Sequence, residues 1–281
     1  MWRASWAVLV LVLLSWSSTG FASGNDFKLN RLTSCVANGD GCMAERDDAA
    51  FETFVTNLGL IFAPSFLSPS ESLGEAGFSV GFETRFSVAS SDPSWRVLDD
   101  LAPTGDEPPL FSTLQLHVRK GLPFSFELDG LMSWLVDSEL FYIGGGVKWT
   151  VSEGWWFLPD LAVRGHGGAL TGAPDLNLAN AGVDVSLSYS FGVGGVSNLT
   201  PYAGYSHMWT IASSRVIDSD PGRNEIPSGN YAPETVFEQI EPQTDRGFVG
   251  LRFIVSYFSL TAEAAFASQM QTYGLHIGAD F

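Results

Sequence analysis

The sequence of 281 residues has few charged side chains, and basic ones are especially scarce. Only 16% of the residues are charged, and 14 basic residues face 31 acidic ones, which gives a formal net charge of −17. Lysine occurs three times, at Lys28, Lys120 and Lys148. A chain so poor in cations has little with which to neutralise a phosphate backbone, so we expect no nucleic-acid partner.

Long apolar runs are scarce as well. One run, from Trp6 to Trp16, follows Arg3 and precedes the small-residue pattern Gly20-Phe-Ala22. This order predicts a secretory signal peptide over residues 1–22, and the run is too short to favour a membrane anchor helix. No second uncharged run of about 18 residues follows, so membrane-spanning helices are not expected in the mature chain.

What the sequence does contain, from Phe78 onward, is a regular alternation of apolar and polar residues. Phe78, Val80 and Phe82, for example, alternate with Ser79 and Gly81. A period of two places alternate side chains on opposite faces of a strand, so the alternation predicts an all-β, antiparallel fold. The predicted strands cover residues 76–88, 110–119, 123–134, 138–150, 156–169, 181–193, 199–213, 245–257, 259–268 and 272–281.

Two architectures fit such strands, a soluble sandwich with an apolar core and a barrel with its apolar face on lipid. The polar faces are rich in glycine and serine and carry charges of both signs, which is typical of a crowded barrel interior. Aromatic residues such as Trp149, Trp155 and Trp156 gather where strands should end, as in the aromatic girdles of membrane barrels. These features favour a transmembrane β-barrel of about ten strands.

The final strand carries a family resemblance. The stretch from Tyr273 to Phe281 ends on an aromatic residue and has apolar residues at alternate positions, including Leu275 and Ile277. It resembles the C-terminal strand of Gram-negative outer-membrane β-barrel proteins. The resemblance implies a location in the outer membrane, contact with its lipid, and recognition of Tyr273, Leu275, Ile277 and Phe281 by the outer-membrane assembly machinery.

The connections support this arrangement. Long connections at 89–109, 170–180 and 214–244 alternate with short turns, except that 134–138 and 268–272 are short on the side that carries the long ones. Outer-membrane barrels place short turns in the periplasm. Ten strands then put both termini of the barrel in the periplasm. The segment 55–66 also alternates, and counting it would raise the number of strands to twelve; we favour ten strands, with 55–66 as periplasmic or inserted structure.

We expect residues 23–75 to form a polar periplasmic segment and residues 76–281 to form the barrel. Cys35 and Cys42 are the only cysteines, and in an exported chain they predict a disulfide that closes a small loop. Asn38 and Asp40 lie in this loop, but no bidentate glutamate follows at calcium-loop spacing, so we expect neither a metal nor another cofactor. A short helix is expected to begin at Asp47.

The polar faces provide the nearest approach to a functional site. They place three histidines, His117, His166 and His276, beside charges of both signs. In a narrow barrel such charges must pair, because an unpaired buried charge is costly. The candidate lumen residues are Glu83, Arg85, Arg119, Glu127, Asp129, Lys148, Asp160, Arg164, Asp184, Arg252, Glu263 and Asp280.

Several functions remain open at this point. The charged lumen can form a closed, purely structural network or line a narrow pore for ions and small solutes. The acidic loops 89–109 and 214–244 offer an outward surface for adhesion or receptor binding. The remaining alternative is an outer-membrane hydrolase that uses His166, with Asp175 nearby in sequence, although no catalytic motif joins them; we therefore expect no enzymatic activity.

Overall fold

The computed structural model describes residues 25–38, 41–98, 108–154, 158–221 and 233–281. The predicted signal peptide, Asp40 and the acidic residues of 99–107 lie outside this described part. Within it, no helix combines the length and the hydropathy that crossing a bilayer requires.

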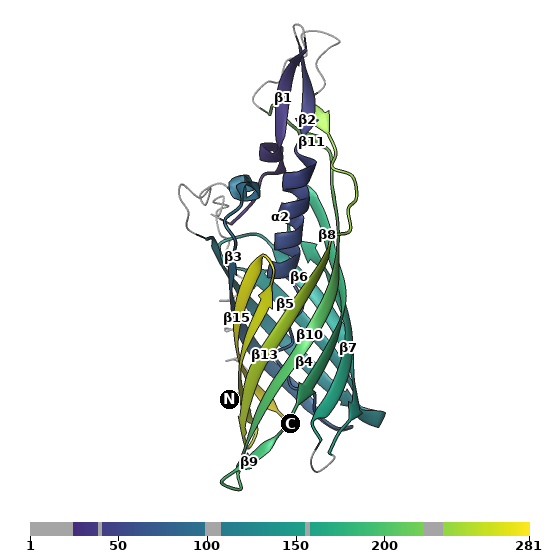
Figure 1. Cartoon of the computed structure of the whole chain (residues 1–281), viewed down its shortest axis with the longest axis vertical. Helices are drawn as coiled ribbons and strands as arrows, with labels where there is room; N and C mark the ends of the chain where they lie inside the picture. The colour runs from purple at the N-terminus through teal and green to yellow at the C-terminus, as the bar shows by residue number, and fades with distance from the viewer. Residues whose placement is uncertain (1–24, 39–40, 99–107, 155–157, 222–232) are drawn as a thin grey trace, which may run out of the picture.

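Ten antiparallel strands close into a barrel (Figure 1). They are β3 (Phe78–Ala89), β4 (Leu110–Leu122), β5 (Phe126–Leu135), β6 (Phe141–Ser152), β7 (Asp160–Thr171), β8 (Leu176–Ser188), β10 (Ser197–Ser214), β13 (Gln243–Val255), β14 (Phe258–Ala267) and β15 (Met270–Asp280). Each strand pairs with its neighbour in the chain, and the last strand, β15, pairs with the first, β3. A short additional strand, β9 (Phe191–Val193), extends the edge of β10. The predicted all-β barrel of ten strands is confirmed.

The two faces of the wall have opposite chemistry, as the alternation predicts. On β3, the side chain of Phe82 is 71% exposed on the outer face, while the next residue, Glu83, is only 2% exposed on the inner face. Val249, Leu251 and Phe253 of β13 are likewise exposed. A wall with large apolar side chains outside and charged ones inside is stable only when lipid covers its outer face.

The barrel has a long-loop end and a short-turn end. The short-turn end carries the turns β4–β5, β6–β7, β8–β10 and β13–β14, together with the C-terminus (Figure 1). The long-loop end carries the longer connections, which include the 3-10 helix η2 (Pro93–Val97) and the strand pair β11 (Ile217–Asp218) and β12 (Glu234–Thr235). The connection predicted over 170–180 is shorter in the structure, since β8 begins at Leu176 rather than near residue 181.

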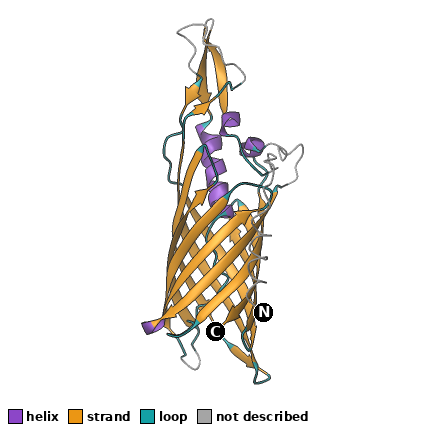
Figure 2. Cartoon of the chain, turned by 180° about the vertical axis from the view of Figure 1, so that it is seen from behind, coloured by secondary structure: helices purple, strands orange, loops and turns teal. Residues whose placement is uncertain are grey.

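The region before the barrel begins beyond the long-loop end. It consists of the 3-10 helix η1 (Leu29–Leu32), the hairpin strands β1 (Thr33–Asn38) and β2 (Gly41–Arg46), and the helix α2 (Asp48–Ile61). The hairpin stands outside the barrel, and α2 points down into its mouth (Figures 1 and 2). After α2, extended residues pass down the lumen and join β3 at the short-turn end.

We name residues 48–73, the helix α2 with the extended stretch after it, the plug. Every residue from 54 to 70 is buried. The sequence left 55–66 as either periplasmic or inserted structure, and the structure buries residues 54–70 inside the barrel. The physical reason is that a helix that is apolar on nearly all sides, as α2 is from Phe54 to Ile61, needs protein around it.

Candidate functional site: the filled lumen

The half of the lumen near the long loops is closed by apolar packing. Phe51 of α2 stacks on Phe237 with ring centroids 4.3 Å apart, and Phe54 packs edge-on against Trp95 at 6.2 Å. Inward-facing wall residues complete this cluster: Leu131, Leu135, Leu140, Leu170, Leu176, Leu178, Met208 and Met270. Within the described part of the chain, this half of the lumen is thus filled largely by packed apolar side chains.

A single glycine sets how closely α2 approaches the wall. A Cβ atom at Gly59 would lie 2.3 Å from Oγ1 of Thr210 on β10, far inside van der Waals contact. The carbonyl oxygen of Gly59 also accepts a hydrogen bond of 3.1 Å from Nδ2 of Asn180 on β8. The last turns of the helix are thus fitted to the inner wall.

Below the helix, two arginines of the wall bind the plug backbone. Arg85 Nη1 donates to the carbonyl oxygen of Ala63 at 2.8 Å, and Arg246 Nη2 donates to that of Pro64 at 3.0 Å. Next along the plug, the hydroxyl of Ser65 donates to a carboxylate oxygen of Glu263 at 2.6 Å. Three consecutive plug residues are therefore held by charged groups of the wall, which makes these hydrogen bonds stronger than neutral ones.

The chain is held again near the short-turn end. The backbone N–H of Ser70 donates to the hydroxyl of Ser188 at 3.0 Å, and its side-chain oxygen lies 2.9 Å from that of Ser186. The carbonyl oxygen of Ser70 accepts from the hydroxyl of Thr150 at 2.7 Å. Lys148 adds a hydrogen bond of 3.0 Å from its ammonium group to the carbonyl oxygen of Glu71.

The charges at the short-turn end form a paired network. Glu127 lies 3.1 Å from the ammonium of Lys148 and 3.4 Å from Arg119. Arg252 forms an ion pair with Glu71 of the plug, and it also faces Asp280 at 3.8 Å. The plug thus supplies one of the acidic partners that balance this end of the lumen.

A second network fills the middle of the lumen. Arg164 reaches Asp129 at 3.4 Å and Asp184 at 3.9 Å, and Nε2 of His166 lies 3.1 Å from Asp184. The guanidinium of Arg164 also lies 4.5 Å from the ring centroid of Phe66, a plug residue. Beside them, Glu83 accepts hydrogen bonds from two histidines, His117 at 3.0 Å and His276 at 3.1 Å.

The structure brings most of the predicted lumen residues together. Two lie nearer the short-turn rim: Asp160, which accepts from the backbone of Gly154 at 3.0 Å, and Asp280, which is partly buried. The buried members are Glu83, Arg85, Arg119, Glu127, Asp129, Lys148, Arg164, Asp184, Arg252 and Glu263.

Sequence reasoning left the place of residues 55–66 open and missed several of the plug's neighbours. Arg246 and Gln115 are buried lumen residues, and Tyr202 donates to Glu263 at 2.7 Å. A signal for the plug was present, because Leu131 and Leu135 interrupt the polar face of β5 near the long-loop end. Apolar side chains on the inner face of a polar barrel indicate an apolar object inside it.

Within the described part of the chain, the side chain on which the hydrolase alternative depends, His166, is buried. His166 is 7% exposed, and its Nε2 lies 3.1 Å from Asp184, whereas Asp175 lies in the connection between β7 and β8. His207 lies instead on the outer wall, 2.7 Å from Asp245. Phe66 of the plug packs edge-on against His166, with ring centroids 6.1 Å apart.

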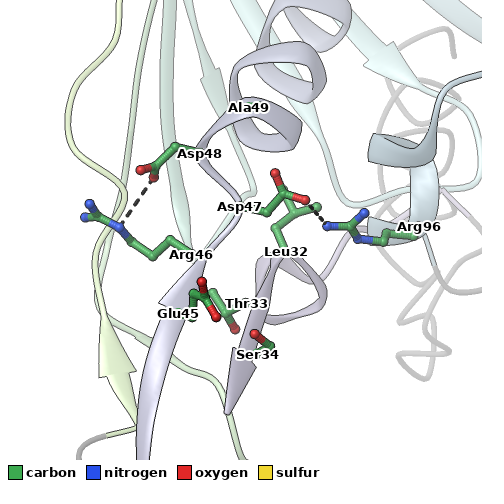
Figure 3. Close-up of a pocket in the computed structure, with 9 residues that line it drawn as sticks. All are labelled: Leu32, Thr33, Ser34, Glu45, Arg46, Asp47, Asp48, Ala49 and Arg96. Atoms are coloured by element: carbon green, nitrogen blue, oxygen red, sulfur yellow. Dashed lines mark hydrogen bonds and ion pairs between the residues drawn. The ribbon is translucent and has the colours of Figure 1, made fainter. Parts of the chain in front are cut away.

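The junction between hairpin and helix forms an open polar pocket of about 510 Å³ at the long-loop end (Figure 3). Within it, Arg96 of η2 donates to the carboxylate of Asp47 at 2.6 Å, and Arg46 lies 3.4 Å from Asp48. Asp47 also caps α2 by accepting from the backbone N–H of Ala50. The hydrogen bond from Arg96, aided by that from Ala50, holds the pKa of the Asp47 carboxyl below its ordinary value.

The disulfide between the cysteines and the assembly signal on the C-terminal strand stay predictions. The antiparallel register of β1 and β2 sets Cys35 opposite Ala44 and Cys42 opposite Ala37, but the side chain of Cys42 lies outside the described part. On β15, Tyr273, Leu275 and Ile277 face outward, and Phe281 pairs through its backbone with Phe78. The proposed roles, a disulfide and an assembly signal, are untested by this geometry.

Comparison with known proteins finds similar solved structures. No family model and no curated protein matches the chain. The KdgM porin is similar at 8% identity and a TM-score of 0.35 over 72% of this chain and 99% of that one. Ail, the attachment invasion locus protein of Yersinia pestis, shows 13% identity and a TM-score of 0.26 over 74% and 99%. The translocator domain of the autotransporter NalP from Neisseria meningitidis shows 8% identity and a TM-score of 0.34 over 84% and 97%.

The fold is that of an outer-membrane β-barrel. This conclusion rests on the chain's own geometry, since the similarities are distant: the barrel is closed, its wall is apolar outside, and its charges are inside. The location predicted from the sequence, the outer membrane of a Gram-negative bacterium, agrees with this architecture.

Proposed function

We propose that this protein is an outer-membrane anchor, closed by its own plug, that displays the β1–β2 hairpin and the long loops at the cell surface. The observation that carries the proposal is the continuous burial of residues 54–70 along the lumen. Of the functions left open by the sequence, this one combines the closed structural barrel with a surface-exposed binding face. It leaves the bound partner unspecified.

The orientation follows from the connections. Outer-membrane barrels place their short turns in the periplasm and their long loops outside. The C-terminus lies at the short-turn end, whereas the hairpin lies beyond the long-loop end (Figure 1). The hairpin and the acidic loops 89–109 and 214–244 would then share the outer face, where they could meet a partner or a surface.

The contacts of the plug argue against free passage of solutes. Withdrawing the plug would remove carbonyl acceptors from Arg85, Arg246 and Lys148, all of which are buried. Water could hydrate these groups in an emptied lumen, but the buried apolar side chains of α2, such as Phe51 and Phe54, would lose their packing partners, which costs free energy. Small-solute passage would therefore require an event that supplies this free energy.

The three lysines provide a direct test of the orientation. Lys28 is exposed beyond the long-loop end, Lys120 is exposed at the short-turn end, and Lys148 is buried. A membrane-impermeant amine reagent applied to intact cells should modify Lys28 and spare Lys120, whereas both should react after lysis. Peptide mass spectrometry reads the result, and modification of Lys120 alone in intact cells would contradict the proposal.

Conductance tests the closure. The purified protein in a planar bilayer should show no regular current steps, because the plug fills the lumen. A reproducible ladder of openings from the unmodified chain would support the pore alternative instead.

A further inference from the structure

Three potential metal ligands from adjacent strands meet at the seam where the barrel closes. Glu83 on β3 lies directly opposite His276 on β15, and His117 comes from the next strand, β4. Both Nδ1 atoms lie close to the same carboxylate oxygen of Glu83, at 3.0 Å from His117 and 3.1 Å from His276. One ligand atom from each residue falls within a group no wider than 4.8 Å, and all three side chains are buried.

The surroundings hold these side chains in place. A Cβ atom on Gly81 would lie 2.3 Å from Cε1 of His276, and one on Gly278 would lie 2.5 Å from its Nε2. Gly81 and Gly278 are paired across β3 and β15, so the two glycines together make room for the imidazole. With its nitrogen turned toward Glu83, the amide of Gln115 donates to the second carboxylate oxygen at 3.0 Å.

A second carboxylate stands behind His117. Oδ1 of Asp129 lies 3.5 Å from Nε2 of His117, and neither of these atoms has a hydrogen-bond partner within the described part of the chain. A metal-bound histidine commonly donates its other ring N–H to a carboxylate, which fixes the tautomer and the direction of the ring. Asp129 has the position of such an outer partner.

We propose that Glu83, His117 and His276 bind one divalent transition-metal ion of the zinc type. Two imidazoles and a carboxylate form a ligand set that zinc accepts, with its fourth position left to water or to the Gln115 amide oxygen after rotation. The ion would bind the Nδ1 lone pair of each imidazole. The Nδ1 proton of each ring would then move to Nε2 if the ring is neutral, or be released if the ring is an imidazolium, so both bound histidines carry one proton, on Nε2. On His117 that Nε2 proton faces Asp129.

The placement gives the ion a structural consequence. It would join β15, β3 and β4, and thus tie the last strand of the barrel to the first two. The ring of Phe66 lies 5.1 Å from that of His117, so the plug covers the site. This proposal replaces the sequence-based expectation of no metal, and it does not depend on what the hairpin displays.

The test uses the full mature chain, refolded in detergent with a slight excess of zinc chloride and then separated from free metal by gel filtration. We expect about one zinc ion per protein by elemental analysis. Glu83→Gln and His276→Ala should each lower the zinc content at least tenfold. Asp129→Asn should weaken zinc binding about tenfold or more, as loss of an outer partner does elsewhere.

His166→Asn is the matched control, since it removes a histidine of the same lumen that pairs with Asp184 and not with Glu83. It should retain the full zinc content. Absence of zinc from the unmodified protein, or equal loss in His166→Asn and His276→Ala, would overturn the proposal.

X-ray absorption at the zinc edge of the unmodified protein keeps the test decisive if a variant fails to fold. Two imidazole ligands are expected. A shell of oxygen ligands alone would mean that zinc is held by the acidic loops, and the proposal would be rejected.

Discussion

Arg85 on the first barrel strand donates a hydrogen bond of 2.8 Å to the carbonyl oxygen of Ala63 in the plug. The acceptor belongs to the backbone, so this hydrogen bond fixes the position of the plug backbone and does not depend on a plug side chain. Arg246 repeats the contact on the next carbonyl, that of Pro64. The plug is thus part of the barrel's folded core.

The ion pair between Arg252 and Glu71 predicts a loss of stability. Arg252→Ala leaves Asp280 and Glu71 without this cation near the short-turn end, and we expect the free energy of unfolding to fall by roughly 2–4 kcal/mol, since breaking a buried pair strands a charge. Urea unfolding in detergent measures the change. Glu71→Gln should lower the stability less than Arg252→Ala does. If the double variant, Arg252→Ala with Glu71→Gln, is no less stable than Arg252→Ala, the loss comes from this pair. A change of ion selectivity without loss of stability would indicate an open channel.

The close approach at Gly59 predicts that a larger residue is harmful there. Gly59→Val drives a side chain into Thr210, and we expect a loss of about 1–3 kcal/mol, as for other overpacked cores. Ala49→Val, at an exposed position in the same helix, is the control without a wall contact. Valine has a lower helix propensity than alanine but a higher one than glycine, so propensity alone would make Gly59→Val the milder change. Thermal unfolding compares the two, and Thr210→Ala should relieve part of the Gly59→Val defect. Equal behaviour of both valine variants would mean that α2 is not seated against β10.

Asp47 predicts a local dependence on pH. Its pKa is lowered in the folded protein, chiefly by the hydrogen bond from Arg96, so its contribution is present above its ordinary pKa and is lost as the pH falls through the lower folded value. The start of α2 should therefore exchange its amide hydrogens faster in strong acid, after correction for the intrinsic rate. Asp47→Ala should remove this dependence and cost about 1 kcal/mol in local stability at neutral pH. An unchanged acid response in that variant would assign the effect to another group.

The cysteine pair predicts a stapled hairpin. An isolated two-stranded hairpin is marginal in water, so we expect the predicted Cys35–Cys42 disulfide to hold β1 and β2 together. Replacing both cysteines by serine should expose the hairpin to proteases while leaving the barrel's unfolding midpoint unchanged. Equal proteolysis rates in the two proteins would show that the hairpin is stable without the bond.

Much of the barrel follows from the sequence because the two-residue period is a local property. The predicted strand 245–257 differs from β13, Gln243–Val255, by two residues at each end, and Glu83 and Asp129 lie inside as predicted. The plug could not be predicted in this way, since its place depends on which surface encloses it. Leu58, Leu60 and Phe62 alternate as in a strand only by chance. Leu58 and Leu60 lie in α2, which ends at Ile61, and Phe62 follows it.

The plug runs through the lumen beside the inner wall, so a designed cross-link between the two can be made. The hydroxyl oxygens of Ser70 and Ser186 lie 2.9 Å apart, so the pair Ser70→Cys and Ser186→Cys should form a disulfide under mild oxidation, detected by peptide mass spectrometry. Pairing Ser70→Cys with Ser87→Cys, a buried position near the long-loop end, should give none. Free thiols in the first pair, in protein whose barrel is folded, would contradict the account.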